Sequence, residues 1–260
     1  RHFQLLGSPV VSQSSVLGVV ILLLDITDKH SAERSRREFS ANVSHELKTL
    51  LTSILGFAEI MKEGLAKPED MQGFAERIHY EASGLLTLID DILELSQLDE
   101  KTELPDREHV DLFSLAENVL SRLKPIADKK GVNLTLQGEH VVVSGYEKIL
   151  DGMLYNLCDN AIKYNVAGGN ATVTIAYKDS KPIVIVSDTG IGIPPEHRPH
   201  IFERFYRVNK SRSKEIGGTG LGLSIVKHGA ILHDITIDMQ SDENKGTTFT
   251  LTFPVSVELS

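Results

Sequence analysis

Two long runs of apolar residues, each with the spacing of a helix, constrain the fold of this chain more than any other feature. The first run is Phe39, Val43, Leu47, Leu50, Leu51, Ile54, Ala58 and Met61. The second run is Phe74, Ile78, Leu85, Leu88 or Ile89, Ile92, Leu95 and Leu98. Intervals of three and four predict one buried stripe on each helix. Gly64 and Pro68 break the pattern between the runs, so we expect an antiparallel helical hairpin.

A helical hairpin of this kind leaves an apolar flank on each of its helices exposed to water. A second copy of the chain can cover both flanks in a two-fold symmetric four-helix bundle. We therefore expect a homodimer.

The composition is that of a soluble globular protein with roughly two domains, because 41% of its 260 residues are hydrophobic and 24% are charged. A net charge of -9 argues against nucleic acid as a direct partner, since such surfaces need a concentrated basic face. The single cysteine, Cys158, lies in an apolar helical pattern, which predicts a buried thiol in a reducing, cytoplasmic setting. The longest apolar run, Val16 to Leu24, is shorter than the roughly 18 to 20 residues that span a bilayer.

The first residues predict two strands followed by a helix. Phe3 to Leu6 and Val16 to Ile26 are rich in apolar and β-branched residues, and turn-forming residues separate them. Lys29 to Glu38 are polar and helix-favouring. This order resembles the last strands of a PAS sensor domain and its exit linker, and an isolated hairpin is the alternative. The start at Arg1, without a methionine, suggests a fragment of a longer protein.

After Leu104-Pro105 the pattern changes to short alternating elements, which predict an α+β fold with helices on a mixed sheet. The expected strands are His109 to Leu112, Val132 to Leu136, Thr172 to Tyr177, Pro182 to Asp188, Ile235 to Gln240 and Thr247 to Phe253. The expected helices are Leu115 to Lys130, Tyr146 to Tyr164, one that ends near Phe205, and Leu221 to Leu232. Polar residues between Phe205 and Gly217 predict a mobile lid.

A histidine beside a carboxylate, His45-Glu46, stands inside the first helical run. Alone, such a pair is usually part of a solvated helix face. It is not half of a zincin site, because that motif needs a second histidine four residues after the first and position 49 is Thr49.

Three segments of the second half carry residues suited to a nucleotide. Asn156, Asn160 and Lys163 fall on one helix face, where an amide oxygen suits Mg²⁺ and an ammonium suits phosphate. The alternative is the wet side of an amphipathic helix. Asp188 closes a strand and is followed by Gly190 and Gly192, which let the backbone pass close to a flat ligand. Its carboxylate is able to accept a hydrogen bond from an adenine amino group.

The third segment, Gly217 to Leu223, is rich in glycine and precedes an apolar helix, where free N–H groups hold phosphates. It is neither a Walker loop nor a Rossmann fingerprint.

The order of the histidine box, the asparagine box, Asp188 to Ile193, Ile201 to Arg207 and the glycine-rich segment closely resembles the sensor histidine kinases of two-component signalling. The resemblance runs from Phe39 to Pro254. It implies a helical dimerisation and phosphotransfer domain followed by an α/β sandwich ATP-binding domain of the Bergerat type. Such a protein phosphorylates its own histidine with ATP and passes the phosphoryl group to an aspartate on the receiver domain of a response regulator.

By this resemblance His45 is the phosphoacceptor, Glu46 its general base, and Arg207 a charge near the γ-phosphate. Asn160 is the Mg²⁺ ligand. The remaining residues implied around ATP are Asn156, Lys163, Tyr164, Asp188, Gly190, Gly192, Gly218, Thr219, Gly220, Leu221 and Gly222. The implied division is 1–27 for PAS-like strands, 28–38 for a linker helix, 39–104 for the phosphotransfer domain and 105–260 for the ATP-binding domain. The resemblance is compatible with a membrane anchor upstream of this cytoplasmic portion.

Two residues near His45 bear on the reverse reaction. In the family, the residue at the position of Thr49 helps place water that dephosphorylates the regulator, and a plain surface threonine is the alternative. The family usually has proline where this chain has Leu50. Leucine favours a straighter helix. This difference supports a second hypothesis, a phosphatase-biased or non-catalytic ATP-binding switch.

Overall fold

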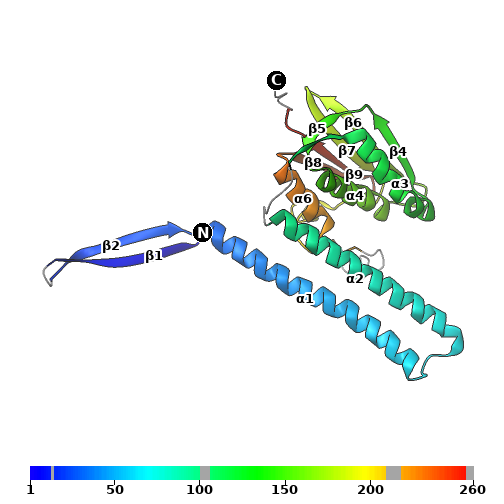
Figure 1. Ribbon diagram of the computed structural model, residues 1–260, viewed down its shortest axis with the longest axis horizontal. Helices are drawn as coiled ribbons and strands as arrows, with labels where there is room; N and C mark the ends of the chain where they lie inside the picture. Colours follow the sequence, from blue (N-terminus) through cyan, green and yellow to red (C-terminus); the bar gives the residue numbers. More distant parts are fainter. Residues whose placement is uncertain (13–14, 100–105, 209–217, 256–260) are drawn as a thin grey trace. The chain divides into compact units, whose positions relative to one another are not determined.

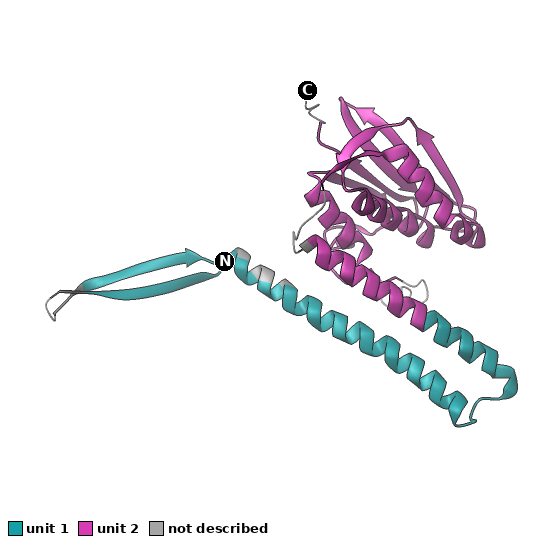
Figure 2. Cartoon of the chain, in the orientation of Figure 1, with its two compact units in different colours: residues 1–81 teal, residues 82–260 magenta. Residues whose placement is uncertain are grey.

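The computed structural model describes residues 1–12, 15–99, 106–208 and 218–255. The chain divides into two compact units, Arg1–Glu81 and Ala82–Ser260 (Figure 2). The boundary falls inside helix α2 (Met71–Asp99), so the second half of this helix belongs to the second unit.

The first unit begins with an antiparallel hairpin of β1 (Phe3–Ser12) and β2 (Ser15–Asp25) (Figure 1). The sequence predicted that strand pairing would stop at the turn-forming residues after Leu6. This was wrong, because β1 continues through Gly7, Ser8 and Pro9, which pair with residues of β2. Proline is tolerated here since a two-stranded sheet leaves each strand an outer edge where no N–H is required.

The hairpin exposes apolar side chains on both of its faces. Leu5, Val19, Ile21 and Leu23 are each 60% exposed or more, and their neighbour Leu22 on the opposite face is 51% exposed. Two strands cannot form a core of their own.

Helix α1 (Thr27–Lys62) starts directly after β2 and runs through His45 and Leu50 without interruption. It ends before Gly64, which has a φ of 66°. A 3-10 turn, η1 (Pro68–Asp70), leads into α2. The predicted helical hairpin is confirmed.

Aromatic contacts hold the closed end of the helical hairpin together within the first unit. The rings of Phe57 on α1 and Phe74 on α2 have centroids 5.8 Å apart. The guanidinium of Arg77 lies 5.9 Å from the centroid of Phe57. Such contacts contribute more than their buried area alone.

The second unit contains the end of α2 and the elements of an α/β fold (Figure 1). In chain order these are β3 (Glu108–Asp111), α3 (Leu112–Lys130), β4 (Asn133–Gly138), β5 (Val142–Gly145), α4 (Glu147–Lys163), β6 (Asn170–Lys178), β7 (Lys181–Asp188), the 3-10 turn η2 (Pro195–His197), α6 (Gly222–Leu232), β8 (Thr236–Asp242) and β9 (Gly246–Thr252). Strand β5 was not predicted. The helix expected to end near Phe205 was wrong, because residues 198–205 form turns and a bend.

A mixed five-stranded sheet in the order β4-β6-β7-β9-β8 forms the frame of this unit. Only β4 and β6 are parallel, and the other neighbours are antiparallel. Helices α3, α4 and α6 pack on one face, where every second strand residue is buried (Figure 1). The opposite face carries half-buried residues such as Thr172, Thr174 and Thr250. This alternation is the period-2 pattern of a sheet covered on one side.

The core lies between the sheet and the three helices. Leu123, Ile162 and Ile175 are completely buried in it. Cys158 on α4 is 1% exposed, which confirms the predicted buried thiol, and burial raises its pKa to about 12. A thiol with this pKa is not a nucleophile at neutral pH.

Among the helices that the described ranges contain, none has both the length and the apolar character needed to cross a membrane.

Two isoleucines of α6 test the orientation of this helix. Ile225 is completely buried and Ile231 is 65% exposed. Ile225→Ala should lower the free energy of unfolding by about 2–5 kcal/mol, because it leaves a cavity in the core. Ile231→Ala should change it by no more than about 0.5 kcal/mol. Urea unfolding followed by circular dichroism measures both, and equal losses would contradict the assigned packing of α6.

Candidate functional site

A cavity of about 800 Å³ opens in the second unit. This volume suits a small organic molecule. The predicted residues that line it are Asn156, Asn160, Lys163, Tyr164, Asp188, Gly192, Arg207, Gly218, Thr219, Gly220 and Gly222. Gly190 and Leu221 do not line it but belong to two of its loops. His45, Glu46 and Thr49 lie on α1 in the first unit.

Helix α4 forms one wall of this cavity. Its apolar side, with Met153, Leu157 and Ala161, is buried in the core. The neighbouring positions Asn156 and Asn160 line the cavity, as do Leu157 and Ala161. The polar residues of this helix therefore face the cavity.

The ammonium of Lys163 is already paired in this wall. Its Nζ lies 2.7 Å from Oδ2 of Asp159, and the two side chains are 27% and 13% exposed. The Lys130 ammonium donates to the backbone oxygen of Lys163, and burial lowers the pKa of Lys130. Two cations therefore lie at the last turn of α4, where the negative end of the helix dipole favours them.

The carboxylate of Asp188 is oriented at the end of β7 by backbone donors. Its Oδ1 accepts hydrogen bonds from the N–H of Gly190 at 2.7 Å and from the N–H of Thr247 at 3.3 Å. Burial raises the pKa of Asp188, and the two hydrogen bonds oppose that rise. Oδ2 accepts neither of these bonds, which leaves an oxygen for a donor in the cavity.

Close packing requires glycine at two predicted positions. A Cβ on Gly190 would stand 2.3 Å from the backbone oxygen of Tyr164. A Cβ on Gly222 would stand 2.4 Å from Oδ1 of Asn156. The two glycines thus bring the loop after β7 and the start of α6 against α4.

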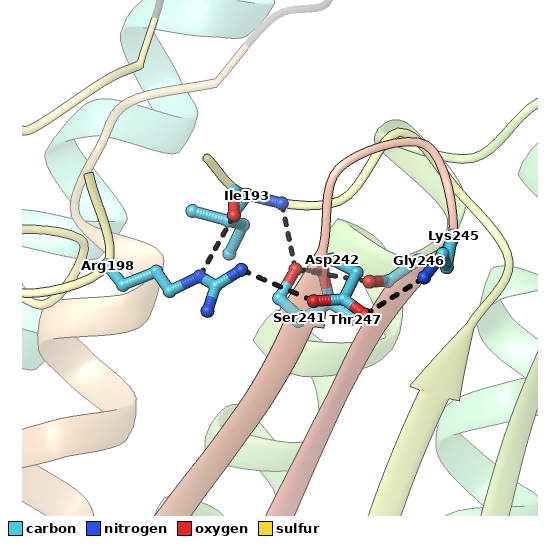
Figure 3. Close-up of polar contacts among 7 residues, drawn as sticks. All are labelled: Ile193, Arg198, Ser241, Asp242, Lys245, Gly246 and Thr247. Carbon is cyan, nitrogen blue, oxygen red and sulfur yellow. Dashed lines mark hydrogen bonds and ion pairs between the residues drawn. The ribbon is translucent and has the colours of Figure 1, made fainter. Parts of the chain in front are cut away.

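A buried serine joins the loop after β7 to the β8–β9 turn (Figure 3). Oγ of Ser241 accepts a hydrogen bond from the N–H of Ile193 at 2.8 Å. It also lies 3.1 Å from the backbone oxygen of Gly246 and 2.9 Å from Oγ1 of Thr247. The N–H of Thr247 also donates to Asp188. This network therefore fixes the loop after β7 and the start of β9 relative to the Asp188 carboxylate.

A second connection between the loop and the turn lies nearer the surface (Figure 3). Nε of Arg198 donates to the backbone oxygen of Ile193 at 3.1 Å, and its Nη2 lies 3.6 Å from Asp242. Asp242 also pairs with Lys245 at 3.4 Å.

The glycine-rich loop is joined to α2. Oγ1 of Thr219 donates to Oδ2 of Asp91 at 2.5 Å, and the N–H of Leu221 donates to the same hydroxyl at 3.2 Å. Thr87, Asp90, Asp91 and Glu94 of α2 all line the cavity. Neighbouring Leu88 and Leu95 are buried, so this half of α2 packs firmly within the second unit.

Glu94 is a half-buried acid against α4. Its Oε1 would be 2.4 Å from a Cβ placed on Gly152. Burial, together with the negative charges of Asp91 and Asp151 and against the opposing charge of Lys148, raises the pKa of Glu94 from 4.5 to about 7.

His45 lies on the surface of α1. Its side chain is 79% exposed. Nδ1 lies 3.9 Å from Oε1 of Glu46, which is beyond hydrogen-bond length. Oγ1 of Thr49 donates to the backbone oxygen of His45 at 2.9 Å.

Arg207 follows a segment of turns that is held by side-chain contacts. Nδ1 of His197 lies 2.7 Å from the hydroxyl of Tyr206, and Nη2 of Arg204 lies 3.1 Å from Nε2 of His228. The predicted lid falls mostly on residues 209–217, which lie outside the described residues.

Four residues of this site were missed by the sequence interpretation: Asp91, Glu94, Ser241 and Thr247. The two acids occupy polar positions of an amphipathic helix, where the ordinary expectation is contact with water. Ser241 lies near the end of β8 and Thr247 near the start of β9. No residue spacing links any of them to Asp188 or to the glycine-rich loop.

No group of three or more His, Cys, Asp or Glu side chains suited to a metal ion occurs in the described part of the chain. A Mg²⁺ ion at Asn160 would thus need further oxygen ligands, which a triphosphate provides. The amide of Asn160 in the cavity wall fits this requirement.

The pKa of Glu94 predicts a pH dependence of stability. Between pH 4.5 and about 7 the folded protein keeps a proton that the unfolded chain has lost. The contribution of this proton to the free energy of unfolding should therefore be fully present below pH 4.5 and be lost as the pH rises through about 7. Glu94→Gln should reduce this loss of stability. Urea midpoints of both proteins at about pH 5 and about pH 8 measure it. An unchanged fall in the variant would show that another group is responsible.

Two family models match this chain. Residues 35–101 match the His Kinase A (phospho-acceptor) domain, and residues 145–257 match the histidine kinase-, DNA gyrase B-, and HSP90-like ATPase. The first match contains His45, and the second contains α4, Asp188 and the glycine-rich loop.

Known proteins resemble the chain over most of its length. The sensor-like histidine kinase SenX3 of Mycobacterium tuberculosis is 37% identical over 240 residues, which are 92% of this chain and 58% of SenX3. The chain thus spans little more than half of this relative.

Two solved structures show similar folds. The histidine kinase ThkA in complex with the response regulator protein TrrA is 27% identical, with a TM-score of 0.67 over 100% of this chain and 77% of that one. Full-length ShkA in complex with AMPPNP is 26% identical, with a TM-score of 0.61 over 84% of this chain and 45% of that one. The two family models together cover more than half of the chain, which therefore belongs to the sensor histidine kinases of two-component systems.

Proposed function

We propose that this protein transfers the γ-phosphoryl group of ATP to His45 and then to an aspartate of a response regulator. One observation carries the proposal: an exposed histidine in a phospho-acceptor domain occurs in the same chain as an ATPase-type cavity with an oriented carboxylate. SenX3, a sensor-like histidine kinase, supports the kinase activity, because its matched region covers 92% of this chain.

His45 is the nucleophile in this proposal. Its Nδ1 is the nitrogen nearer to Glu46, so a proton on Nδ1 faces the carboxylate and leaves the lone pair of Nε2 for attack. Nε2 forms a bond to the γ-phosphorus while the bond to the bridging oxygen of ADP breaks. Glu46 is the general base that takes the ring proton, and a side-chain rotation has to shorten the 3.9 Å separation first.

The nucleotide occupies the cavity with its base at Asp188 and its phosphates at the glycine-rich loop. The Oδ2 atom of Asp188 accepts a hydrogen bond from the adenine amino group. Gly190 and Gly192 allow the base to approach the loop after β7. Gly218, Thr219, Gly220, Leu221 and Gly222 surround the phosphates at the start of α6, where the helix dipole favours negative charge.

Residues of α4 and the turn segment complete the phosphate site. Asn156, Lys163 and Tyr164 contact the phosphates and the ribose, and Arg207 balances charge at the γ-phosphate. Asn160 holds Mg²⁺, which neutralises phosphate charge when bound.

A response regulator is the proposed partner that receives the phosphoryl group. The ThkA structure contains the response regulator protein TrrA, and its fold matches the whole of this chain. We also propose the reverse reaction, with Thr49 placing the water. Its hydroxyl donates to the backbone of His45 and keeps its lone pairs as acceptors.

The working form is proposed to be a homodimer with a four-helix bundle. On α1, Leu51 and Leu55 are 47% and 66% exposed, and on α2, Leu86 and Leu93 are 64% and 55% exposed. Apolar residues at such intervals need a covering surface.

The proposed domain division is 1–27, 28–38, 39–104 and 105–260. The exposed apolar faces of the β1–β2 hairpin support its origin in a larger, PAS-like sensor domain. The kinase portion is proposed to act in the cytoplasm.

Labelling with ATP tests the acceptor. Incubation with γ-labelled ATP should give an acid-labile, base-stable label, as a phosphoramidate does. His45→Ala should abolish the label, whereas His79→Ala, at another exposed histidine of the hairpin, should retain it. Label that survives in His45→Ala would refute the acceptor assignment.

Nucleotide titration tests the role of the buried serine. Ser241→Ala removes the acceptor of the Ile193 N–H, and leaving such a group unpaired costs about 1–3 kcal/mol. If this cost is felt at Asp188, ADP should bind about tenfold more weakly, as about 1.4 kcal/mol implies. Ser187→Ala removes a comparable pair with Thr248 at 2.8 Å and should leave the affinity unchanged. Calorimetry measures the ADP affinity of both variants. Equal ADP affinities of Ser241→Ala and Ser187→Ala would exclude a positioning role for Ser241.

A further inference from the structure

The contact between Asp91 and Thr219 places a carboxylate at the loop that is proposed to hold phosphate. Thr219 belongs to the glycine-rich loop just before α6 (Gly222–Leu232). Its hydroxyl donates to Oδ2 of Asp91 at 2.5 Å. A short bond from a hydroxyl to an anionic oxygen is what a phosphate oxygen would form at this place. Both residues line the cavity.

The surroundings of Asp91 include groups that favour its negative charge and groups that oppose it. Its carboxylate is half-buried, and burial raises its pKa, while the Thr219 hydrogen bond and the positive charge of Lys163 oppose that rise. Asp90 and Asp159 add negative charge to the same wall. A triphosphate entering the cavity would meet this carboxylate, and two anions in one low-dielectric site repel each other.

We propose that Asp91 is an internal competitor of the nucleotide phosphates: its carboxylate occupies a phosphate position at Thr219, so that phosphate binding and the contact between α2 and the loop exclude each other. This inference rests on the proposed nucleotide site and adds its regulation. Docking of α2 lowers nucleotide affinity, and by reciprocity bound nucleotide weakens the docking of α2.

The competition depends on phosphate and leaves the base site alone. Asp188 and the loop after β7 do not take part in the contact between α2 and Thr219. Adenosine should therefore bind equally well whether or not Asp91 carries its charge, whereas ADP should not.

Calorimetric titration of the full chain with ADP and with adenosine tests the proposal. Asp91→Asn keeps the shape of the side chain and removes its charge. It should tighten ADP binding about tenfold, within the range of ordinary coupling between sites, and leave adenosine binding unchanged. Asp90→Asn is the matched control, because it removes the same charge from the exposed neighbouring position on the cavity wall. It should tighten ADP binding much less.

Each other outcome overturns the competition. Equal tightening by the two variants would mean general repulsion without a role for the Thr219 contact. Weaker ADP binding in Asp91→Asn would make Asp91 part of the nucleotide site. If the unmodified chain bound neither adenosine nor ADP, the proposed nucleotide site would be refuted as well. Binding of adenosine with no effect of Asp91→Asn on ADP would refute the competition alone.

Discussion

Helix α4 has to serve the core and the cavity at once, and the rest of the second unit depends on this constraint. Its apolar side, including Met153 and Leu157, is held against the sheet by hydrophobic burial. A helix fixed on one side has no freedom to rotate, so Asn156 and Asn160 must face the cavity. The core thus determines the angle of the helix, and local contacts such as the 2.9 Å hydrogen bond from Nδ2 of Asn156 to the backbone oxygen of Gly152 orient the polar side chains.

The end of the cavity around Asp188 is assembled from pieces that are far apart in the chain. Asp188 receives one hydrogen bond from its own loop and one from Thr247, and Ser241 joins that loop to the same strand. Three backbone segments thus meet around one carboxylate. The desolvation of Asp188 is offset by hydrogen bonds rather than by a cation, which leaves the site suited to a neutral donor.

Helix α2 takes part in both compact units. Its first part joins α1 through Phe57 and Phe74, and its second part supplies Asp91 and Glu94 to the wall of the cavity. A half-buried acid with a pKa of about 7 and a carboxylate that accepts a hydrogen bond from Thr219 are costly in this position. Neither is needed to bury the apolar side of α2.

The sequence by itself determined the local structure and the kinds of residue in the site. Periodicity predicted the helical hairpin and most of the strands, and motif order predicted Asn160, Asp188 and the glycine-rich loop as cavity residues. It did not predict β5 or the turns at residues 198–205, because short segments carry little periodic signal. Only the tertiary structure decided which distant residues meet. Asp91 contacts Thr219, and Ser241 contacts Ile193, because the packing of the elements brings them together. The partners of each pair are far apart in the chain, and no sequence pattern connects them.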